Sequence, residues 1–213
     1  MSEVYGKMSE LLILGNVEEI KKVTQKALDE GSQASDILQK GLLAGMDVIG
    51  QRFKAGEMFI PEVLRSAKTM HASMEILRPL LSESEASGTG TVLIGTVEGD
   101  LHDIGKNLVG MMLEGAGFRV VDLGTDVQPE AFLAAAKEHK PQILAMSALL
   151  TTTMPKMGET LNVLKEAGIR DQIKVMAGGA PVTQDFINEI GADAYGSNAT
   201  VAVEKARALI WRG

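Results

Sequence analysis

The sequence TVLIGTV, Thr91–Val97, is a continuous apolar run that leads into the polar loop EGDLHDIG, Glu98–Gly105. A run of this kind predicts a strand that is buried on both faces. Comparable runs, each followed by a helical pattern, recur at 118–123, 142–147 and 173–177, with a weaker one at 192–195. Strands that alternate with helices predict an α/β domain with a five-stranded parallel sheet. Ligands of such sheets bind beyond the carboxyl ends of the strands, so the loops after these runs are the candidate site.

The region before this sheet shows helical periodicity and almost no strand pattern. Asn16 is placed to cap a helix, Gly31 suits the position just past its end, and Pro61 suits a first helical turn. The apolar residues recur at helical spacing in four segments, 2–14, 17–28, 37–53 and 61–81. The pattern predicts an N-terminal four-helix bundle.

The composition changes at Ser82–Gly90, a small and polar stretch that is typical of a flexible linker. We therefore expect a helical-bundle domain at 1–85, a linker that ends at 86–90, and a sheet domain at 91–213. A chain of 213 residues is long enough for two such units.

The composition excludes several classes of chemistry. The chain has no cysteine, which removes disulfides, iron–sulfur clusters and thiol nucleophiles. Its net charge of −7 argues against binding to nucleic acid or to an anionic membrane surface. The first apolar run, Leu11–Leu14, is too short for a signal or membrane segment, so we expect a cytoplasmic protein.

The loop after the first strand carries a histidine between two acids. The glycines of this loop have neither dinucleotide-binding nor P-loop spacing. In one interpretation Asp103 caps the next helix and His102 is an incidental loop residue. In the other, Asp100 accepts the second ring N–H of His102, as carboxylates do beside metal-bound imidazoles. One histidine cannot hold a bare ion, but it could be the single protein ligand of a metal already held by a macrocycle.

Two more loops are expected at the same edge of the sheet. The hydroxyls in Ser147–Thr153 could cap a helix, and Gly178-Gly179 could form an ordinary turn. Together with His102, however, small residues and hydroxyls along one edge leave room for a long ligand and can bind its polar end.

These three segments resemble a known family. DLHDIG at Asp100–Gly105, SAL at Ser147–Leu149 and Gly178-Gly179 resemble the D-x-H-x-x-G, S-x-L and G-G signature of cobalamin-binding domains. The stretch 45–61 is similar to the helical cap of methionine synthase and of small corrinoid proteins from methyltransferase systems. The resemblance covers nearly the whole chain, and it implies a helical bundle over one face of a corrin and a Rossmann-like, flavodoxin-type domain beneath the other.

The resemblance also implies a site. It gives His102 the lower axial position on cobalt, with the cofactor base-off and its dimethylbenzimidazole displaced into a slot beside the sheet. Asp100 and Thr153 would form a relay behind His102, where methionine synthase has a serine in place of Thr153. Gln39 departs from a cap position that is acidic in methionine synthase. The cofactor-binding positions that the resemblance implies are Gly99, Asp100, Leu101, His102, Asp103, Ile104, Gly105, Ser147, Leu149, Thr151, Thr153, Gly178, Gly179 and Ala199, with Phe53 and Ile60 in the cap.

The function implied is that of a corrinoid methyl carrier. Methylcobalamin, cob(I)alamin or a related corrinoid would be its cofactor, and a separate reductive activase would restore oxidised cobalt. A substrate-specific methyltransferase, of methylamine, betaine, methanol or methoxyarene type, would load it. A second methyltransferase would pass the methyl group to tetrahydrofolate or to a thiol such as coenzyme M. The alternatives are a cobalamin-dependent sensor, the cobalamin subunit of a mutase, and a flavodoxin-like domain that binds no corrin.

Overall fold

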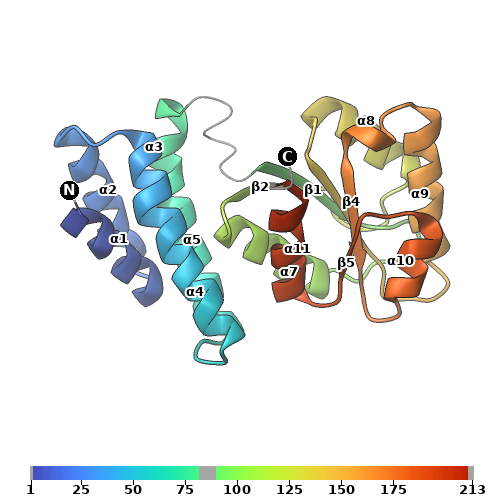
Figure 1. The fold of residues 1–213 in the computed structure, drawn as a ribbon, viewed down its shortest axis with the longest axis horizontal. Helices are drawn as coiled ribbons and strands as arrows, with labels where there is room; N and C mark the ends of the chain where they lie inside the picture. The colour runs from blue at the N-terminus through green and yellow to red at the C-terminus, as the bar shows by residue number, and fades with distance from the viewer. Residues whose placement is uncertain (1, 82–89, 211–213) are drawn as a thin grey trace. The chain divides into compact units, whose positions relative to one another are not determined.

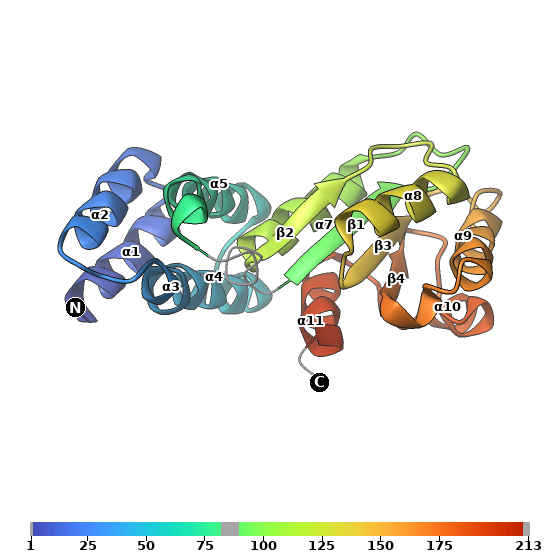
Figure 2. The same ribbon diagram turned by 90° about the horizontal axis from the view of Figure 1, so that it is seen from above.

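The computed structural model of the chain describes residues 2–81 and 90–210 (Figures 1 and 2). The chain divides into two compact units, one of residues 1–88 with 114–118 and one of residues 89–113 with 119–213. The predicted linker lies outside the described residues except for Gly90, which is the first residue of a strand and so does not belong to a linker.

The N-terminal unit is helical, as the sequence predicts. Its third helix is continuous, and the middle of that helix is a π-helical segment that the periodicity did not predict. In residues 2–81 the helices are α1 (Ser2–Leu14), α2 (Val17–Asp29), α3, η1 and α4 in succession (Ala34–Asp36, Ile37–Leu43 and Ala44–Lys54), and α5 (Ile60–Leu77) with the 3₁₀ turn η2 (Arg78–Leu80).

The predicted helix ends are confirmed. The Asn16 side chain accepts a hydrogen bond from the Glu19 backbone N–H at 3.1 Å, which caps α2. Gly31 follows this helix with a φ of +87°, a left-handed conformation that glycine adopts without steric cost. Pro61 lies in the first turn of α5, where its missing N–H leaves no hydrogen bond unmade.

The interior of the helical unit is mainly apolar and includes a hydrogen-bonded polar pair. Large side chains such as Met8, Leu12 and Ile49 are fully buried. Thr24 of α2 and Ser73 of α5 are also buried, and their hydroxyls are joined by a hydrogen bond of 2.6 Å. Because each hydroxyl has a partner, the burial of this pair carries little desolvation cost.

The second unit contains a parallel sheet with the strand order β2-β1-β3-β4-β5, the order of flavodoxin-type folds. This confirms the predicted fold class. The strands are β1 (Gly90–Thr96), β2 (Phe118–Asp122), β3 (Ile143–Ser147), β4 (Lys174–Gly178) and β5 (Ala194–Gly196). The helices are α7 (Ile104–Gly115), α8 (Pro129–His139), α9 (Pro155–Glu166), α10 (Gln184–Ile190) and α11 (Ala199–Ile210), with the 3₁₀ turn η3 (Arg170–Gln172).

Helices cover both faces of the sheet. Buried residues of α8, α9 and α10 pack with Leu93, Leu144 and Val175 in one apolar core. Side chains alternate along a strand, so Ile94 and Met176 point to the opposite face, the side of α7 and α11 (Figures 1 and 2). No helix in the described residues is long and apolar enough to cross a membrane.

In the sheet unit the element boundaries differ from the sequence prediction by one or two residues, whereas the third helix of the helical unit begins at Ala34, three residues before the expected start. The strand expected at 91–97 spans 90–96, and that at 192–195 spans 194–196. Helix α7 begins at Ile104, two residues before the expected start at Lys106. The alternative in which a hydroxyl of Ser147–Thr153 caps the next helix does not hold at Thr153, because α9 begins at Pro155 without a side-chain cap and the Thr153 side chain faces the loop of Asp100.

Candidate functional site

The site lies at the carboxyl edge of the sheet. Strand register aligns Thr96 of β1 with Ser147 of β3, Ser147 with Gly178 of β4, and Gly178 with Gly196 of β5. The loops that follow these residues therefore leave the sheet side by side. They are the loops in which the sequence places its candidate residues.

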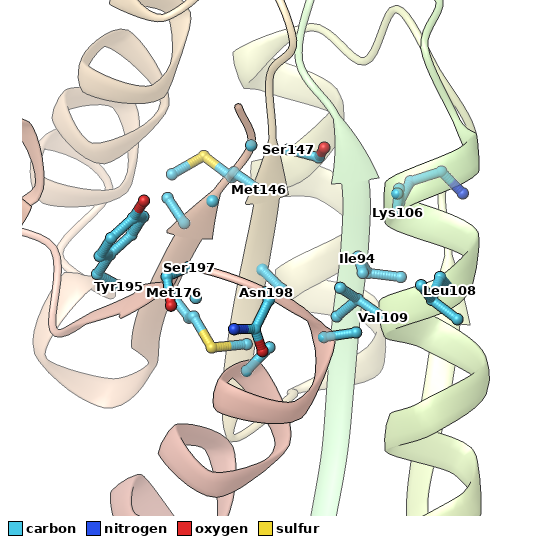
Figure 3. Close-up of a pocket in the computed structure, with 18 of the residues that line it drawn as sticks. Ile94, Lys106, Leu108, Val109, Met146, Ser147, Met176, Tyr195, Ser197 and Asn198 are labelled. Atoms are coloured by element: carbon cyan, nitrogen blue, oxygen red, sulfur yellow. The ribbon is translucent and has the colours of Figure 1, made fainter. Parts of the chain in front are cut away.

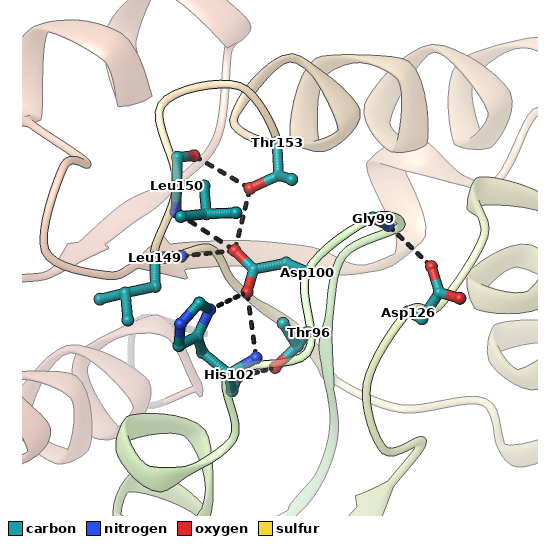
Figure 4. Close-up of polar contacts among 8 residues, drawn as sticks. All are labelled: Thr96, Gly99, Asp100, His102, Asp126, Leu149, Leu150 and Thr153. Carbon is teal, nitrogen blue, oxygen red and sulfur yellow. Dashed lines mark hydrogen bonds and ion pairs between the residues drawn. The ribbon is translucent and has the colours of Figure 1, made fainter.

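Asp100 is the buried centre of this edge (Figure 4). Its Oδ1 accepts the backbone N–H of His102 at 3.1 Å and lies 2.7 Å from Nδ1 of the same residue. Its Oδ2 accepts the backbone N–H groups of Leu149 and Leu150, at 2.7 and 3.2 Å, and the hydroxyl of Thr153 at 2.9 Å. One carboxylate thus joins the loop after β1 to the loop after β3.

The surroundings of Asp100 favour its ionised form. Burial raises the pKa of the carboxyl, but the hydrogen bonds from Leu149, His102 and Thr153 outweigh burial and hold the pKa well below its ordinary value. Asp100 is therefore a carboxylate at neutral pH. A carboxylate can only accept hydrogen bonds, so the proton between it and His102 belongs to Nδ1 of the ring.

His102 presents its other ring nitrogen outward. The side chain is 52% exposed, although its Nδ1 is bonded to a fully buried carboxylate. With the proton on Nδ1, Nε2 carries a free lone pair and can ligate a metal. The buried Thr96 hydroxyl donates to the His102 carbonyl at 2.9 Å and so holds the backbone of the histidine to the end of β1.

The donor set suits a metal that brings its other ligands with it. Among residues 2–81 and 90–210 no three His, Cys, Asp or Glu side chains are grouped closely enough to hold an ion. A single exposed imidazole nitrogen backed by a carboxylate fits one axial position of a metal held in a macrocycle.

Exposed apolar side chains lie in the loop after β1, at the first residue of α7 and in the loop after β3. Leu101 and Ile104 are 74% and 85% exposed, and Leu149 and Leu150 are about half as exposed. A group of exposed apolar side chains in neighbouring loops is typical of a binding surface. This surface suits the flat apolar face of a ring system.

A pocket of about 320 Å³ opens on the face of the sheet between α7 and α11 (Figure 3). Ile94, Ala145 and Met176 form its floor, and Val109 and Ala202 are among the residues that form its walls. Five residues singled out from the sequence line it, namely Gly105, Ser147, Gly178, Gly179 and Ala199. The pocket is large enough for a small heterocycle with part of a polar chain.

Backbone packing requires glycine at two positions, Gly178 at the end of β4 and Gly179 directly after it. A Cβ on Gly178 would overlap the carbonyl oxygen of Gly196, and one on Gly179 would overlap that of Ala148. Gly179 also has a φ of +130°, which other residues rarely adopt. Gly105 differs, because a Cβ there would meet no protein atom and would project from the pocket wall.

The remaining candidates lie outside the Asp100 contacts and the pocket. Thr151 is exposed in the loop after β3 and does not line the pocket. The side chain of Asp103, which one interpretation places as the cap of α7, accepts from the Asn107 side chain at 3.0 Å. Phe53 and Ile60, partly buried and 41% exposed, flank the turn between α4 and α5 in the helical unit. Their roles stay predictions.

Several residues of the site are not predictable from the sequence. Leu150 and Thr96 act through a backbone N–H and a strand hydroxyl, for which the sequence carries no distinguishing signal. Lys106 is nearly fully buried on the pocket wall, where it pairs with Asp122 and donates to Asn107 at 2.6 Å. Its amino group points away from the other labelled pocket residues (Figure 3). A charged residue directly after a loop glycine gives no sign of burial.

The fold and the site together define a class of protein. A flavodoxin-type sheet carries an outward-facing, carboxylate-backed histidine beside a slot-like pocket, and a helical unit precedes it in the chain. This is the arrangement expected of a cobalamin-binding protein.

Comparisons with known proteins agree. Residues 90–204 and residues 4–78 each match a family described as a B12 binding domain. The chain is 47% identical to trimethylamine corrinoid protein 1 of Methanosarcina acetivorans, with 98% of this chain and 97% of that protein covered. It is 43% identical to the dimethylamine corrinoid protein of Methanosarcina barkeri, with 98% of both covered.

A solved structure extends the likeness to three dimensions. The methanol:cobalamin methyltransferase complex of Methanosarcina barkeri contains a chain that is 34% identical, with a TM-score of 0.89, 99% of this chain covered and 81% of that chain. The protein belongs to the family of B12-binding corrinoid proteins, with both the helical and the sheet domain of that family.

Proposed function

We propose that the chain is a corrinoid methyl carrier that binds its cofactor base-off, with His102 as the lower cobalt ligand. The observation that carries this proposal is the exposed imidazole whose Nδ1 lies 2.7 Å from the buried Asp100 carboxylate. The pocket beside it supports the proposal, since a displaced nucleotide tail needs a slot of that kind. When bound, the corrinoid supplies a cobalt centre that accepts a methyl group and gives it away.

The residues behind His102 set its strength as a donor. The Asp100 carboxylate takes a hydrogen bond from Nδ1 and makes Nε2 more electron-rich. The Thr153 hydroxyl lies 2.9 Å from both Asp100 Oδ2 and the Leu150 carbonyl, but it has one proton to donate. With Asp100 protonated, Thr153 can donate to Leu150 and accept from the carboxyl. The Thr153 hydroxyl therefore keeps a hydrogen-bond partner in either protonation state of Asp100.

The pocket would hold the tail of the cofactor. Ser147 and Lys106 lie at the carboxyl end of this slot, and Ala199 at the first turn of α11. Its floor is apolar, which suits the flat ring of a displaced base, and the Ser147 hydroxyl can bind a polar group of the tail.

The helical unit would shield the other face of the corrin. Phe59 is 68% exposed and Ile60 is 41% exposed at the start of α5, and Phe53 is near the end of α4. Exposed apolar residues gathered at one turn suit a surface that covers a reactive centre and excludes water.

The names of similar proteins support the partners that we propose. One relative is named a trimethylamine corrinoid protein, another a dimethylamine corrinoid protein, and one similar chain was solved in a methanol methyltransferase complex. We infer that a methylamine or methanol methyltransferase loads this carrier. A second methyltransferase takes the methyl group to tetrahydrofolate or a thiol, and a reductive activase restores oxidised cobalt.

Reconstitution tests this function. The chain is loaded with hydroxocobalamin, reduced, and mixed in turn with trimethylamine, dimethylamine or methanol and the matching methyltransferase. The proposal predicts that the absorption spectrum of bound cobalt changes to the methylated form with one of these pairs, and faster than with free cobalamin. A chain that binds no corrinoid, or one that no pair methylates faster than free cobalamin, contradicts the proposal.

A further inference from the structure

Asp126, in the turn between β2 and α8, holds the backbone that precedes His102. Its Oδ1 accepts the backbone N–H of Gly99 at 2.7 Å (Figure 4), and its own N–H donates to the Asp100 carbonyl at 3.0 Å. Asp126 therefore contacts both residues that lead into the relay, from the strand next to β1. The Asp100 N–H donates to the Val97 carbonyl at 3.1 Å and closes the turn on its other side.

The backbone at this contact has an unusual conformation. Asp126 has a φ of +55° and Gly99 a φ of +78°. Among the described residues other than glycine, Lys140 alone shares this left-handed region, at the end of α8. Aspartate and asparagine tolerate the left-handed region better than most residues, because their short polar side chains can bond locally. Asp126 thus combines an uncommon backbone conformation with hydrogen bonds to two neighbouring residues, which indicates a specific role in holding this turn.

We propose that Asp126 is a positioning residue for cobalt ligation. It fixes Gly99 and Asp100, and the fixed Asp100 carboxylate in turn aligns the His102 ring and keeps the proton on Nδ1. This inference rests on the proposed function, in which His102 ligates cobalt. Asp126 does not line the pocket, and the hydrogen bonds described above join it to Gly99 and Asp100.

The positioning role of Asp126 can be tested without disrupting the folded core. Its side chain is exposed, so a smaller residue leaves no cavity in the core. The loop of His102 is held by Thr96 as well, which keeps the end of the loop in place when the Asp126 contact is lost. The expected consequence is a looser Asp100, with less preorganised ligation, in a chain that still folds.

Three variants test the role. Asp126→Gly keeps the left-handed backbone but removes the acceptor of the Gly99 N–H. Asp126→Asn keeps both an Oδ1 acceptor and the tolerance for this conformation. Lys140→Gly is the matched control, because it alters the other left-handed residue, whose backbone N–H bonds only to Ala136 at the end of α8.

Two readouts are used. In the cofactor-free chain, ¹⁵N NMR of histidine measures the fraction of His102 with its proton on Nδ1. In the chain loaded with methylcobalamin, absorption measures the ratio of histidine-ligated to unligated cobalt. We expect Asp126→Gly to lower that ratio about tenfold, the size of one charge-assisted hydrogen bond. Asp126→Asn should lower it by less than about threefold, and Lys140→Gly should match the unmodified chain.

The outcomes separate the two proposals. If the unmodified chain ligates cobalt through His102 and Asp126→Gly equals it in both readouts, the positioning role is wrong. If the unmodified chain binds no corrinoid, the proposed function fails, and the NMR of the cofactor-free chain alone decides the role of Asp126. Amide exchange of Gly99 in the unmodified chain needs no variant. A slowly exchanging N–H supports the contact with Asp126, and a freely exchanging one overturns the inference.

Discussion

Replacing Asp100 with asparagine should move the proton of the His102 ring from Nδ1 to Nε2. The asparagine has one oxygen and one NH₂ group where the carboxylate has two acceptors. Its oxygen is best placed toward Leu149, Leu150 and Thr153, which donate to Oδ2. The NH₂ group then faces His102, where Oδ1 now receives two hydrogen bonds. Since an NH₂ group donates, the ring must accept at Nδ1 and carry its proton on Nε2.

The size of the effect follows from these contacts. The His102 ring can change tautomer and keep a hydrogen bond to residue 100, but the His102 backbone N–H loses its acceptor. One part-buried donor is then unpaired, which costs about 1–3 kcal/mol of stability. The remaining bonds lose the contribution of the charge. We expect the free energy of unfolding to fall by roughly 2–4 kcal/mol. Cobalt ligation through Nε2 should be lost, because that nitrogen no longer has a free lone pair.

Urea unfolding of the cofactor-free chain measures the stability, and ¹⁵N NMR of histidine identifies the tautomer. Asp103→Asn is the matched control, because this exposed neighbour accepts only from the Asn107 side chain and should change the stability by less than about 0.5 kcal/mol. An Asp100→Asn chain that keeps the proton on Nδ1, or unfolds at the same urea concentration as the unmodified chain, would refute the reasoning.

The other predictions concern pH, Thr153 and two glycines. Because hydrogen bonds lower the pKa of Asp100 in the folded chain, its stabilisation is complete above the unfolded value of about 3.9 and is lost as the pH falls below it; the unfolding midpoints of the unmodified and Asp100→Asn chains should therefore converge in acid. Thr153→Val should leave corrinoid binding nearly intact but shift the pH dependence of cobalt ligation or the reduction potential, and unchanged values of both would remove Thr153 from the relay. Gly179→Ala should lower the free energy of unfolding by at least about 2 kcal/mol, since its Cβ would overlap the Ala148 carbonyl, whereas a small change would argue against this packing. Gly105→Ala should keep the stability within about 0.5 kcal/mol and weaken cobalamin binding in a titration, and equal affinity would place the cofactor elsewhere.

The parallel sheet could be predicted because its inner strands β1, β3 and β4 are largely buried on both faces. Runs such as Thr91–Val97 are almost continuously apolar, and this pattern is typical of a strand between two helical layers. The start of the second helix at Asn16 is predictable from a local signal, because asparagine is a preferred capping residue whose side chain accepts a hydrogen bond from the first turn. The π-helical segment Ile37–Leu43 could not be predicted, since its apolar spacing is compatible with an ordinary helix.

The site could be predicted in part. His102 and Asp100 are separated by one residue, so their contact is local and visible in the sequence. Thr153 was placed through the resemblance to a known family, and its contact with Asp100 spans 53 positions. Asp126 contacts the same loop across the sheet, but nothing in its own neighbourhood distinguishes it from an ordinary turn residue. Contacts made by tertiary structure between common residue types leave no signal in one sequence.

The central claim is that His102 ligates cobalt, and electron paramagnetic resonance of the cobalt(II) form tests it most directly. An axial nitrogen ligand splits each cobalt line into a triplet, and ¹⁵N labelling of histidine alone should change the triplet to a doublet. We predict this change in the unmodified chain and loss of the protein-derived splitting in His102→Ala. A splitting that ignores the histidine label, or that persists in His102→Ala, would contradict it.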